Sequence, residues 1–327
     1  MPTSSTSGLH LAVKILKDRG GWQDGDEIIT TPFTFVSTNH AIVYENLKPV
    51  FADIDTHLCL DPIAVERLIG PRTRAVMFVG IGGNTGQWPV IVELCRRRGL
   101  SLILDSAHQA GTTLAGRAPG LDADATVFSF HAVKNLGTAD GGMVCFADAA
   151  DDVRARRLSW LGIDKDTFQR TLDGGNYKWR YEVNEIGYKY HGNSIMAALG
   201  LVQLRRLEAD NAHRRRISAV YDEELAGIAG ISLIPQPRDT VSSRHLYQVR
   251  IARRDAAIPF LNGHRIFPGV HYRDNTQYQV YIEAQGTCPE AARAGDEVLS
   301  LPLHLGVAED DARRVAGVLR QFVVDAT

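Results

Sequence analysis

Residues 75–105, with the sequence AVMFVGIGGNTGQWPVIVELCRRRGLSLILD, hold the pattern that decides the fold. Two apolar runs, Ala75–Gly80 and Leu100–Leu104, have the length and composition of buried strands. Trp88–Arg98, which lies between them, has the spacing of a helix. A strand, a helix and a second strand in this order form a crossover that places the two strands parallel. The stretch therefore predicts an α/β fold.

The same alternation continues on both sides of this stretch. The other predicted strands are Glu27–Thr31, Lys48–Ala52, Ala125–Phe130 and Gly142–Phe146. The other predicted helices are Ser7–Asp18, Ser37–Tyr44 and Asp61–Ile69. Strands separated by helices predict a mostly parallel sheet sandwiched by helices, and such a sheet binds its ligands at the carboxyl ends of its strands.

The second half of the chain has a different pattern. Asn193–Leu225 is predicted to form one long helix or two helices end to end, and its basic run His213–Arg216 is predicted to be a solvated helix face. A strand at His245–Ile251 and a final helix at Glu309–Val323 follow. The length of 327 residues fits two domains, so we expect a large α/β domain over residues 1–212 and a small C-terminal α+β domain over residues 213–327.

Composition excludes several classes of protein. With 44% hydrophobic and 23% charged residues the chain is an ordinary globular one, not a disordered chain, a collagen-like repeat or a small disulfide scaffold. Its 36 basic and 38 acidic residues give a net charge of −2, so no global positive field is present to hold nucleic acid.

The cysteines and histidines offer no metal-site pattern. The four cysteines are scattered without a CxxC pair, and no two histidines lie three or four residues apart, so we expect no metal site and no disulfide framework. The N-terminus has no charged region followed by an apolar one, so we expect no signal peptide, and no apolar run approaches about 20 residues. These features predict a cytoplasmic protein with no membrane partner.

Three short segments carry side chains suited to chemistry. Asp105 leaves a buried strand, and Lys134 follows Ser129 in a loop that ends at Gly141–Gly142. Thr3–Gly8 supplies hydroxyls and free N–H groups at the start of a helix, where a phosphate can bind. Taken singly, each has a plain structural explanation as a cap or a solvated charge. Together they meet the needs of pyridoxal phosphate: a phosphate cradle, a carboxylate for the pyridine nitrogen and a Schiff-base lysine.

At these segments the sequence resembles the DegT/DnrJ/EryC1/StrS family of sugar aminotransferases, which are fold-type I pyridoxal-phosphate enzymes of the aspartate aminotransferase superfamily. The likeness runs in order through nearly the whole chain. The matching segments are Ser4–Ala12, Gly25–Ile29, Thr31–Thr38, Pro49–Asp55, the segments around Asp105 and Lys134, Gly187–Tyr190, His245–Tyr247, Gly269–Tyr272 and Leu299–Leu303.

The resemblance implies a role for each matching residue. Lys134 would form the Schiff base and move the proton, Asp105 would hold the pyridine nitrogen protonated, and His108 would lie beside the phenolic oxygen of the cofactor. Phe35 would pack on the pyridine ring. The phosphate would be held by Ser5, Thr6 and Ser129, and the sugar substrate would lie near His271 and Tyr272.

The resemblance also implies a homodimer, because sites of this fold type are completed at a subunit boundary. In the family an Asn or Arg of the partner reaches the cofactor phosphate, and here His191 or Asn193 would replace it. Two other departures concern the surroundings of the site. Glycines occupy much of Gly80–Asn84, where the family has a histidine and an aromatic residue. The phosphate segment begins almost at Met1, so we expect either that the start is misassigned or that the pocket is partly open.

The glycines at 80–86 are not a dinucleotide fingerprint, because Thr85 occupies the third glycine position of GxGxxG and no acidic residue ends a second strand about 20 positions on. Four clustered aromatic residues are compatible either with stacking on a nucleotide base or with a core or interface: Trp160, Tyr177, Trp179 and Tyr181.

The function expected from the resemblance is transfer of an amine from L-glutamate to a keto group of a nucleotide-linked deoxyhexose, with pyridoxamine phosphate as the intermediate. The Phe130–Ala132 version of the lysine block resembles members that act at C4. Two alternatives stay open: a lyase or dehydratase with the same cofactor, against which Lys134 argues, and a catalytically silent binding or regulatory protein.

Overall fold

The computed structural model describes residues 1–164 and 181–325, and its centre is a six-stranded sheet. The strand order is β2-β1-β3-β4-β6-β7. The first five of these are parallel, and β7 runs antiparallel to β6 at one edge. The predicted mostly parallel sheet is therefore confirmed. The strands are β1 (Glu27–Thr30), β2 (Lys48–Phe51), β3 (Thr73–Val79), β4 (Ser101–Asp105), β6 (Ala125–Ser129) and β7 (Gly142–Phe146).

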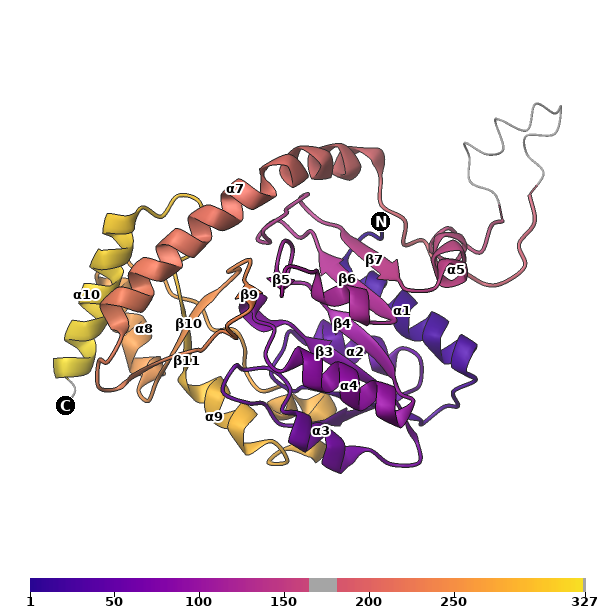
Figure 1. Cartoon of the computed structure of the whole chain (residues 1–327), viewed down its shortest axis with the longest axis horizontal. Coiled ribbons are helices and arrows are strands. Elements are labelled where there is room, and N and C mark those ends of the chain that lie inside the picture. The colour runs from indigo at the N-terminus through magenta and orange to yellow at the C-terminus, as the bar shows by residue number, and fades with distance from the viewer. Residues whose placement is uncertain (165–180, 326–327) are drawn as a thin grey trace.

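Helices cover both faces of this sheet (Figure 1). α1 (Ser5–Gly20) and α2 (Ser37–Val43) pack on one face, and α3 (Pro62–Leu68) and α4 (Trp88–Arg98) pack on the other. Successive side chains of β3 point to opposite faces: Met77 lies in the first core and Phe78 in the second, against Trp88. This explains why β3 is apolar at nearly every position. α5 (Ala149–Ser159) packs beside α1.

The start of α1 lies at the carboxyl end of the sheet. Ser4 caps the helix, since its hydroxyl accepts a hydrogen bond from the backbone N–H of Ser7 at 3.1 Å. Gly142, at the start of β7, allows the close approach, because a Cβ there would lie 2.8 Å from the backbone of Ser4 and Ser5. Any larger residue at position 142 would push the helix start away from the strand ends.

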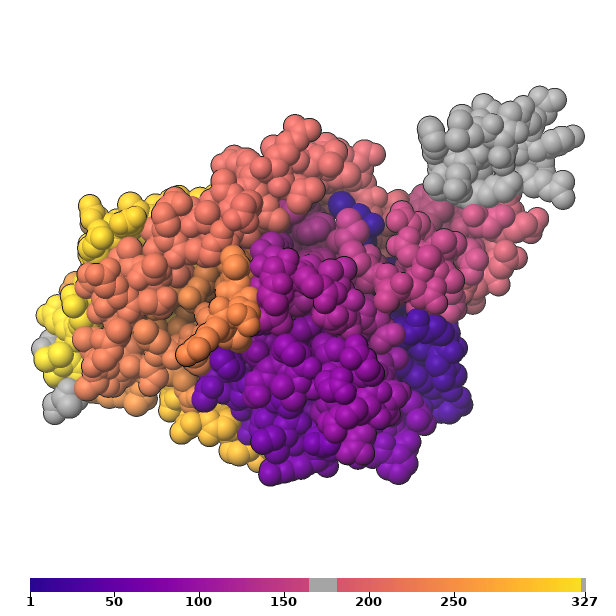
Figure 2. All heavy atoms as spheres, viewed as in Figure 1, coloured from indigo at the N-terminus to yellow at the C-terminus, as the bar shows by residue number. Residues whose placement is uncertain are grey.

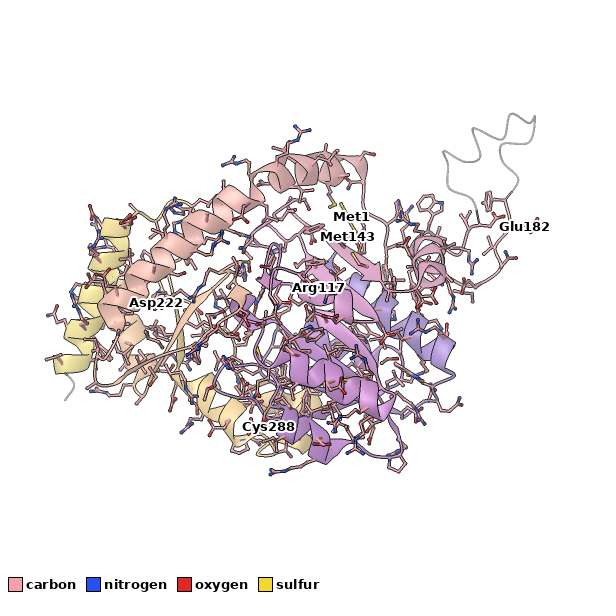
Figure 3. All side chains as sticks on the ribbon, viewed as in Figure 1. Met1, Arg117, Met143, Glu182, Asp222 and Cys288 are labelled. Carbon is pink, nitrogen blue, oxygen red and sulfur yellow. The ribbon has the colours of Figure 1, made fainter. Side chains whose placement is uncertain are left out.

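One continuous helix, α7 (Ser194–Leu225), joins the large sheet to the core of the C-terminal half of the chain (Figure 1). Its C-terminal half packs on α10 (Glu309–Asp325) and on a three-stranded antiparallel sheet of order β11-β10-β8. Figure 3 places Asp222 on this half, where it accepts a hydrogen bond from the Tyr247 hydroxyl at 2.8 Å. The remaining elements are β8 (Ile231–Leu233), β10 (Tyr247–Ile251), α8 (Arg254–Gly263) and β11 (Val298–Leu301).

The basic run of α7 is not the solvated face that the sequence predicts. Arg214 is buried, and its guanidinium donates to the backbone oxygen of Leu303 at 2.7 Å. Arg215 is half-buried, and Arg216 is exposed. The prediction is wrong at Arg214 because α7 crosses the 303–307 segment there, a contact that charge pattern alone does not reveal.

One core is shared by the two predicted domains. α9 (Pro289–Glu297), although late in the chain, buries Ala291 and Ala294 in the core formed with α3 and α4. A two-stranded ribbon of β5 (Thr113–Leu114) and β9 (Thr240–Val241) also joins the two halves. The expected boundary between residues 212 and 213 falls inside α7 and stays a prediction. No helix in residues 1–164 and 181–325 is long and apolar enough to cross a membrane.

Candidate active site

A cavity of about 420 Å³ lies at the carboxyl ends of β3, β4 and β6, beside the start of α1. This is the edge of a parallel sheet at which ligands bind. The cavity brings together nearly all of the residues singled out from the sequence. Its lining includes Ser5, Thr6, Phe35, Asp105, His108, Ser129, Lys134, His271 and Tyr272.

Asp105, the last residue of β4, lies in the floor of the cavity and is only 4% exposed. Its carboxylate accepts hydrogen bonds from the Thr38 hydroxyl at 2.8 Å and from the backbone N–H of Ala107 at 3.1 Å. Burial raises the pKa of Asp105, while these two donors and the nearby Lys134 act in the opposite direction. A cationic N–H that entered the cavity would favour the ionised carboxylate.

Lys134 projects from the loop that follows β6. The loop is held by backbone hydrogen bonds from Ala132 N–H to the Ala139 oxygen and from Thr138 N–H to the Phe130 oxygen. Burial lowers the pKa of Lys134 to about 8, and the negative charge of Asp105 opposes this shift. A lysine with such a pKa is partly neutral near pH 7.5, as a nucleophilic or proton-accepting amine must be.

Another part of the cavity lining is suited to an anion. The side chains of Ser5 and Thr6 line it from the first turn of α1, whose backbone N–H groups carry the positive end of a 16-residue helix dipole. Ser129, the last residue of β6, is buried and lines the same cavity. Hydroxyls and helix N–H groups of α1 and β6 thus form an anion site in the cavity.

His108 is held in one tautomer by the glycine segment. Its Nδ1 accepts a hydrogen bond from the backbone N–H of Gly82 at 3.1 Å, so the proton of the neutral ring is on Nε2. Nε2 lies 3.2 Å from the Tyr272 hydroxyl and donates to it. Burial lowers the pKa of His108 well below its usual value and raises that of Tyr272, so both are neutral. Gly82 has a φ of +60°, which favours glycine.

The two remaining lining residues form the mouth of the cavity. Phe35 is 58% exposed, and its ring centroid lies 6.1 Å from that of Tyr272. His271 is positioned by Ser300, whose hydroxyl lies 2.9 Å from Nδ1. The exposed ring of Phe35 is available to pack on a planar ligand in the cavity.

His191 and Asn193 do not line the cavity. The Asn193 side chain caps α7 by accepting from the Met196 N–H at 3.0 Å, and the His191 ring packs on Trp160 with centroids 4.1 Å apart. Their predicted contact with a partner's cofactor phosphate stays a prediction. Lys189 Nζ lies 3.5 Å from the centroid of the Trp160 ring, so one face of that ring is already occupied. Tyr177 and Trp179 lie outside the described residues.

Several residues of the site have no local sequence signal. Thr38, Asn135 and His245 lie in segments that match the family, but nothing in those segments assigns them a partner. Gly80 is a further example, because a Cβ there would lie 2.0 Å from the buried Gln109 amide. Gln109 fills that space and donates to the backbone oxygen of Asn84 at 2.8 Å.

Comparison with known proteins gives the family. The family model described as "DegT/DnrJ/EryC1/StrS aminotransferase family" matches residues 2–320. The chain belongs to this family. Its fold is that of the pyridoxal-phosphate-dependent sugar aminotransferases, and the protein is an enzyme of this transaminase class.

Individual relatives cover almost the entire chain. The dTDP-4-dehydro-2,3,6-trideoxy-D-glucose 4-aminotransferase of Saccharopolyspora spinosa is 35% identical over 98% of this chain and 83% of the relative. The crystal structure of the aminotransferase TlmJ from Streptoalloteichus hindustanus is 35% identical, with a TM-score of 0.90 over 100% of this chain and 86% of that one. DesV of S. venezuelae, in complex with a ketimine intermediate, is 29% identical, with a TM-score of 0.88 over 98% of this chain and 83% of that one.

Proposed function

We propose that this enzyme uses pyridoxal phosphate to move an amine from L-glutamate to a keto group, at C4, of a nucleotide-linked deoxyhexose. The observation that carries the proposal is the placement of Lys134 and Asp105 in one cavity whose lining also holds an anion site. The chemistry also agrees with the aminotransferase family of the chain.

The residues present fit the cofactor. Its phosphate would be held by Ser5, Thr6 and Ser129, and its ring would lie between Phe35 and the sheet with the nitrogen at Asp105. When bound, the cofactor supplies an electron sink that stabilises negative charge on the amine-bearing carbon. The close approach of β7 to Ser4 and Ser5 at Gly142 keeps the anion site narrow.

The protein's own groups supply the rest of the chemistry. Lys134 Nζ, neutral in part because of its lowered pKa, accepts the proton from the substrate carbon and returns it. The Asp105 carboxylate keeps the ring nitrogen protonated. Tyr272 accepts from His108, so its own hydroxyl proton is free to be donated into the cavity.

The choice of substrate rests on relatives and on the lysine block. The Saccharopolyspora spinosa relative is by its name a 4-aminotransferase of a dTDP-linked keto sugar, and the Phe130–Ala132 segment resembles members that act at C4. We test this by incubating the enzyme with glutamate and a panel of nucleotide-linked 3-keto and 4-keto sugars. Product mass should show amination of 4-keto sugars, whereas amination of 3-keto sugars alone would contradict the C4 assignment. Elimination products would favour a lyase.

The rate at which the apoprotein captures pyridoxal phosphate should depend on pH through Lys134. Only the neutral amine reacts, and the pKa of Lys134 is lowered to about 8. We therefore expect the capture rate to rise about 15-fold between pH 6.5 and pH 8, to rise about twofold more above pH 8 and then to level off. Stopped-flow absorbance measures this rate. A midpoint near pH 10, the pKa of an ordinary lysine, would show that burial does not lower the pKa of Lys134.

We also propose that the enzyme is a homodimer. The N-terminal half of α7 lies at the outer edge of the molecule (Figure 2). Large apolar side chains are exposed on it. Helices with exposed apolar side chains all round need a further partner to cover them. His191 and Asn193 lie at the start of this helix. A partner docked there would bring them near the candidate active site of that partner. The exposed apolar residues are Ile195, Leu199, Leu201, Val202 and Leu204.

A double substitution tests this surface. Leu199→Asp with Val202→Asp places two charges on the apolar face, so the dimer should dissociate to monomers at micromolar concentration. Analytical ultracentrifugation measures the mass. The matched control is Ile63→Asp, an exposed apolar residue on α3, which should leave the dimer intact. A wild-type protein that is monomeric at this concentration would overturn the proposal.

A further inference from the structure

A second cavity of about 920 Å³ lies beside the candidate active site, between the lysine loop, α7 and the segment 300–306. Lys134 and His271 line both cavities, so the two are neighbours. His245 and Asn135 line only the second. Both of these side chains are buried, and the proposed mechanism assigns no role to either.

Asn135 uses its entire amide in hydrogen bonds. Its Nδ2 donates to Asn211 Oδ1 at 2.7 Å and to the backbone oxygen of Ser243 at 2.7 Å. Its Oδ1 lies 2.8 Å from Nδ1 of His245. The residue after Lys134 is thereby fastened to α7 on one side and to the 243–245 segment on the other.

The direction of each of these hydrogen bonds is fixed. A backbone oxygen can only accept, so the Ser243 oxygen faces the NH₂ group of Asn135. The Ala110 oxygen fixes Asn211 in the same way, since Asn211 Nδ2 donates to it at 2.9 Å. Asn135 must therefore turn its oxygen to His245, and His245 Nδ1 must carry a proton to donate.

His245 has no second proton. It is buried, and the charged and titratable groups that act on it are Lys134, Arg214 and His271, with the ring of His108 at 4.3 Å between centroids; Asp210 lines the same cavity. Burial first, and then the charges of Lys134 and Arg214, lower the pKa of His245 well below its usual value. With the single proton on Nδ1, Nε2 keeps a lone pair.

We propose that Asn135 is a positioning residue for Lys134: it fixes the lysine loop and holds His245 as the Nδ1–H tautomer, which presents an acceptor to the cavity that Lys134 lines. An acceptor suits a lysine that alternates between amine and ammonium, whereas a second donor or cation would disfavour the ammonium. The proposal rests on the proposed role of Lys134, but the tautomer itself can be measured without cofactor or substrate.

Asn135→Asp removes the Nδ2 hydrogen-bond donor and keeps the shape of the side chain. The carboxylate cannot donate to Asn211 or Ser243, and its charge favours a doubly protonated His245. The same charge should move the pKa of Lys134 upward from about 8 by about one unit. Asn211→Ala is the matched control: it removes a buried amide nearby, but the Ser243 oxygen still orients Asn135, so neither property should change.

The experiment is ¹H–¹⁵N NMR of the histidine rings in the apoprotein, with a ¹³C titration of the lysine side chains. In the wild type we expect the His245 Nδ1 to be protonated and Nε2 to be bare. Asn135→Asp should protonate both nitrogens near neutral pH and shift the Lys134 midpoint upward. An Nε2–H tautomer in the wild type, or an unchanged His245 and Lys134 in Asn135→Asp, would overturn the proposal. If that variant does not fold, the wild-type tautomer alone decides. Loss of activity with the expected tautomer present would count against the proposed function instead.

Discussion

Lys134→Ala is expected to lower kcat for amine transfer by about 10³-fold or more. The alanine can neither bind the cofactor covalently nor carry the proton, and a positioned acid–base group alone contributes about 10²–10⁴-fold. No other lysine lines the candidate active site of the described chain. Steady-state kinetics with glutamate and an accepted keto sugar measure this loss.

The control for this substitution is Lys48→Ala. Lys48 is an exposed lysine of β2 that lies 3.7 Å from Glu27, so its loss should leave kcat unchanged. The Lys134→Ala protein should keep its fold and its melting temperature, because a buried lysine contributes little to the free energy of unfolding. A kcat within tenfold of the wild type would remove Lys134 from the chemistry.

Asp105→Asn is expected to reduce kcat by about 10²–10³-fold and to weaken cofactor binding. The amide keeps the size of the side chain but lacks the charge that holds the ring nitrogen protonated. Breaking a buried charge pair by removing one partner costs about 3–5 kcal/mol, and every 1.4 kcal/mol corresponds to about a factor of ten. Kinetics and a titration of the apoprotein with cofactor measure both effects.

Asp26→Asn makes the same chemical change at another buried carboxylate. Asp26 is 4% exposed, as Asp105 is, but it accepts from Arg74 at 2.7 Å, away from the cavity. We expect this variant to be less stable and to keep its kcat. If both variants lost activity only in proportion to their loss of folded protein, Asp105 would have a structural role alone.

The large sheet was predictable because each of its strands is a short apolar run between turn residues. α4 begins at Trp88 and ends at Arg98 in both the prediction and the structure, since Pro89 lies in its first turn and Gly99 closes it with a φ of +64°. The short elements of the core in the C-terminal half of the chain were not predicted. α8 contains Pro259, and β8 has only three residues, so neither has a distinct period.

Only the site residues that follow predicted strands could be placed from the sequence. Asp105 and Lys134 follow strands whose ends meet at one edge, and their segments resemble a family. One cluster joins three residues that lie up to 110 positions apart in the sequence: Asn135, Asn211 and His245. In the sequence the two asparagines look like ordinary polar residues of a loop and a helix. Only coordinates show that the three meet.

Absorption spectra of the purified protein with pyridoxal phosphate and glutamate test the central claim most directly. We expect a visible band of bound cofactor that is absent in Lys134→Ala, shifts when glutamate is added and returns when a nucleotide-linked keto sugar follows. A protein that takes up no cofactor, or a band that persists unchanged through both additions, would contradict it.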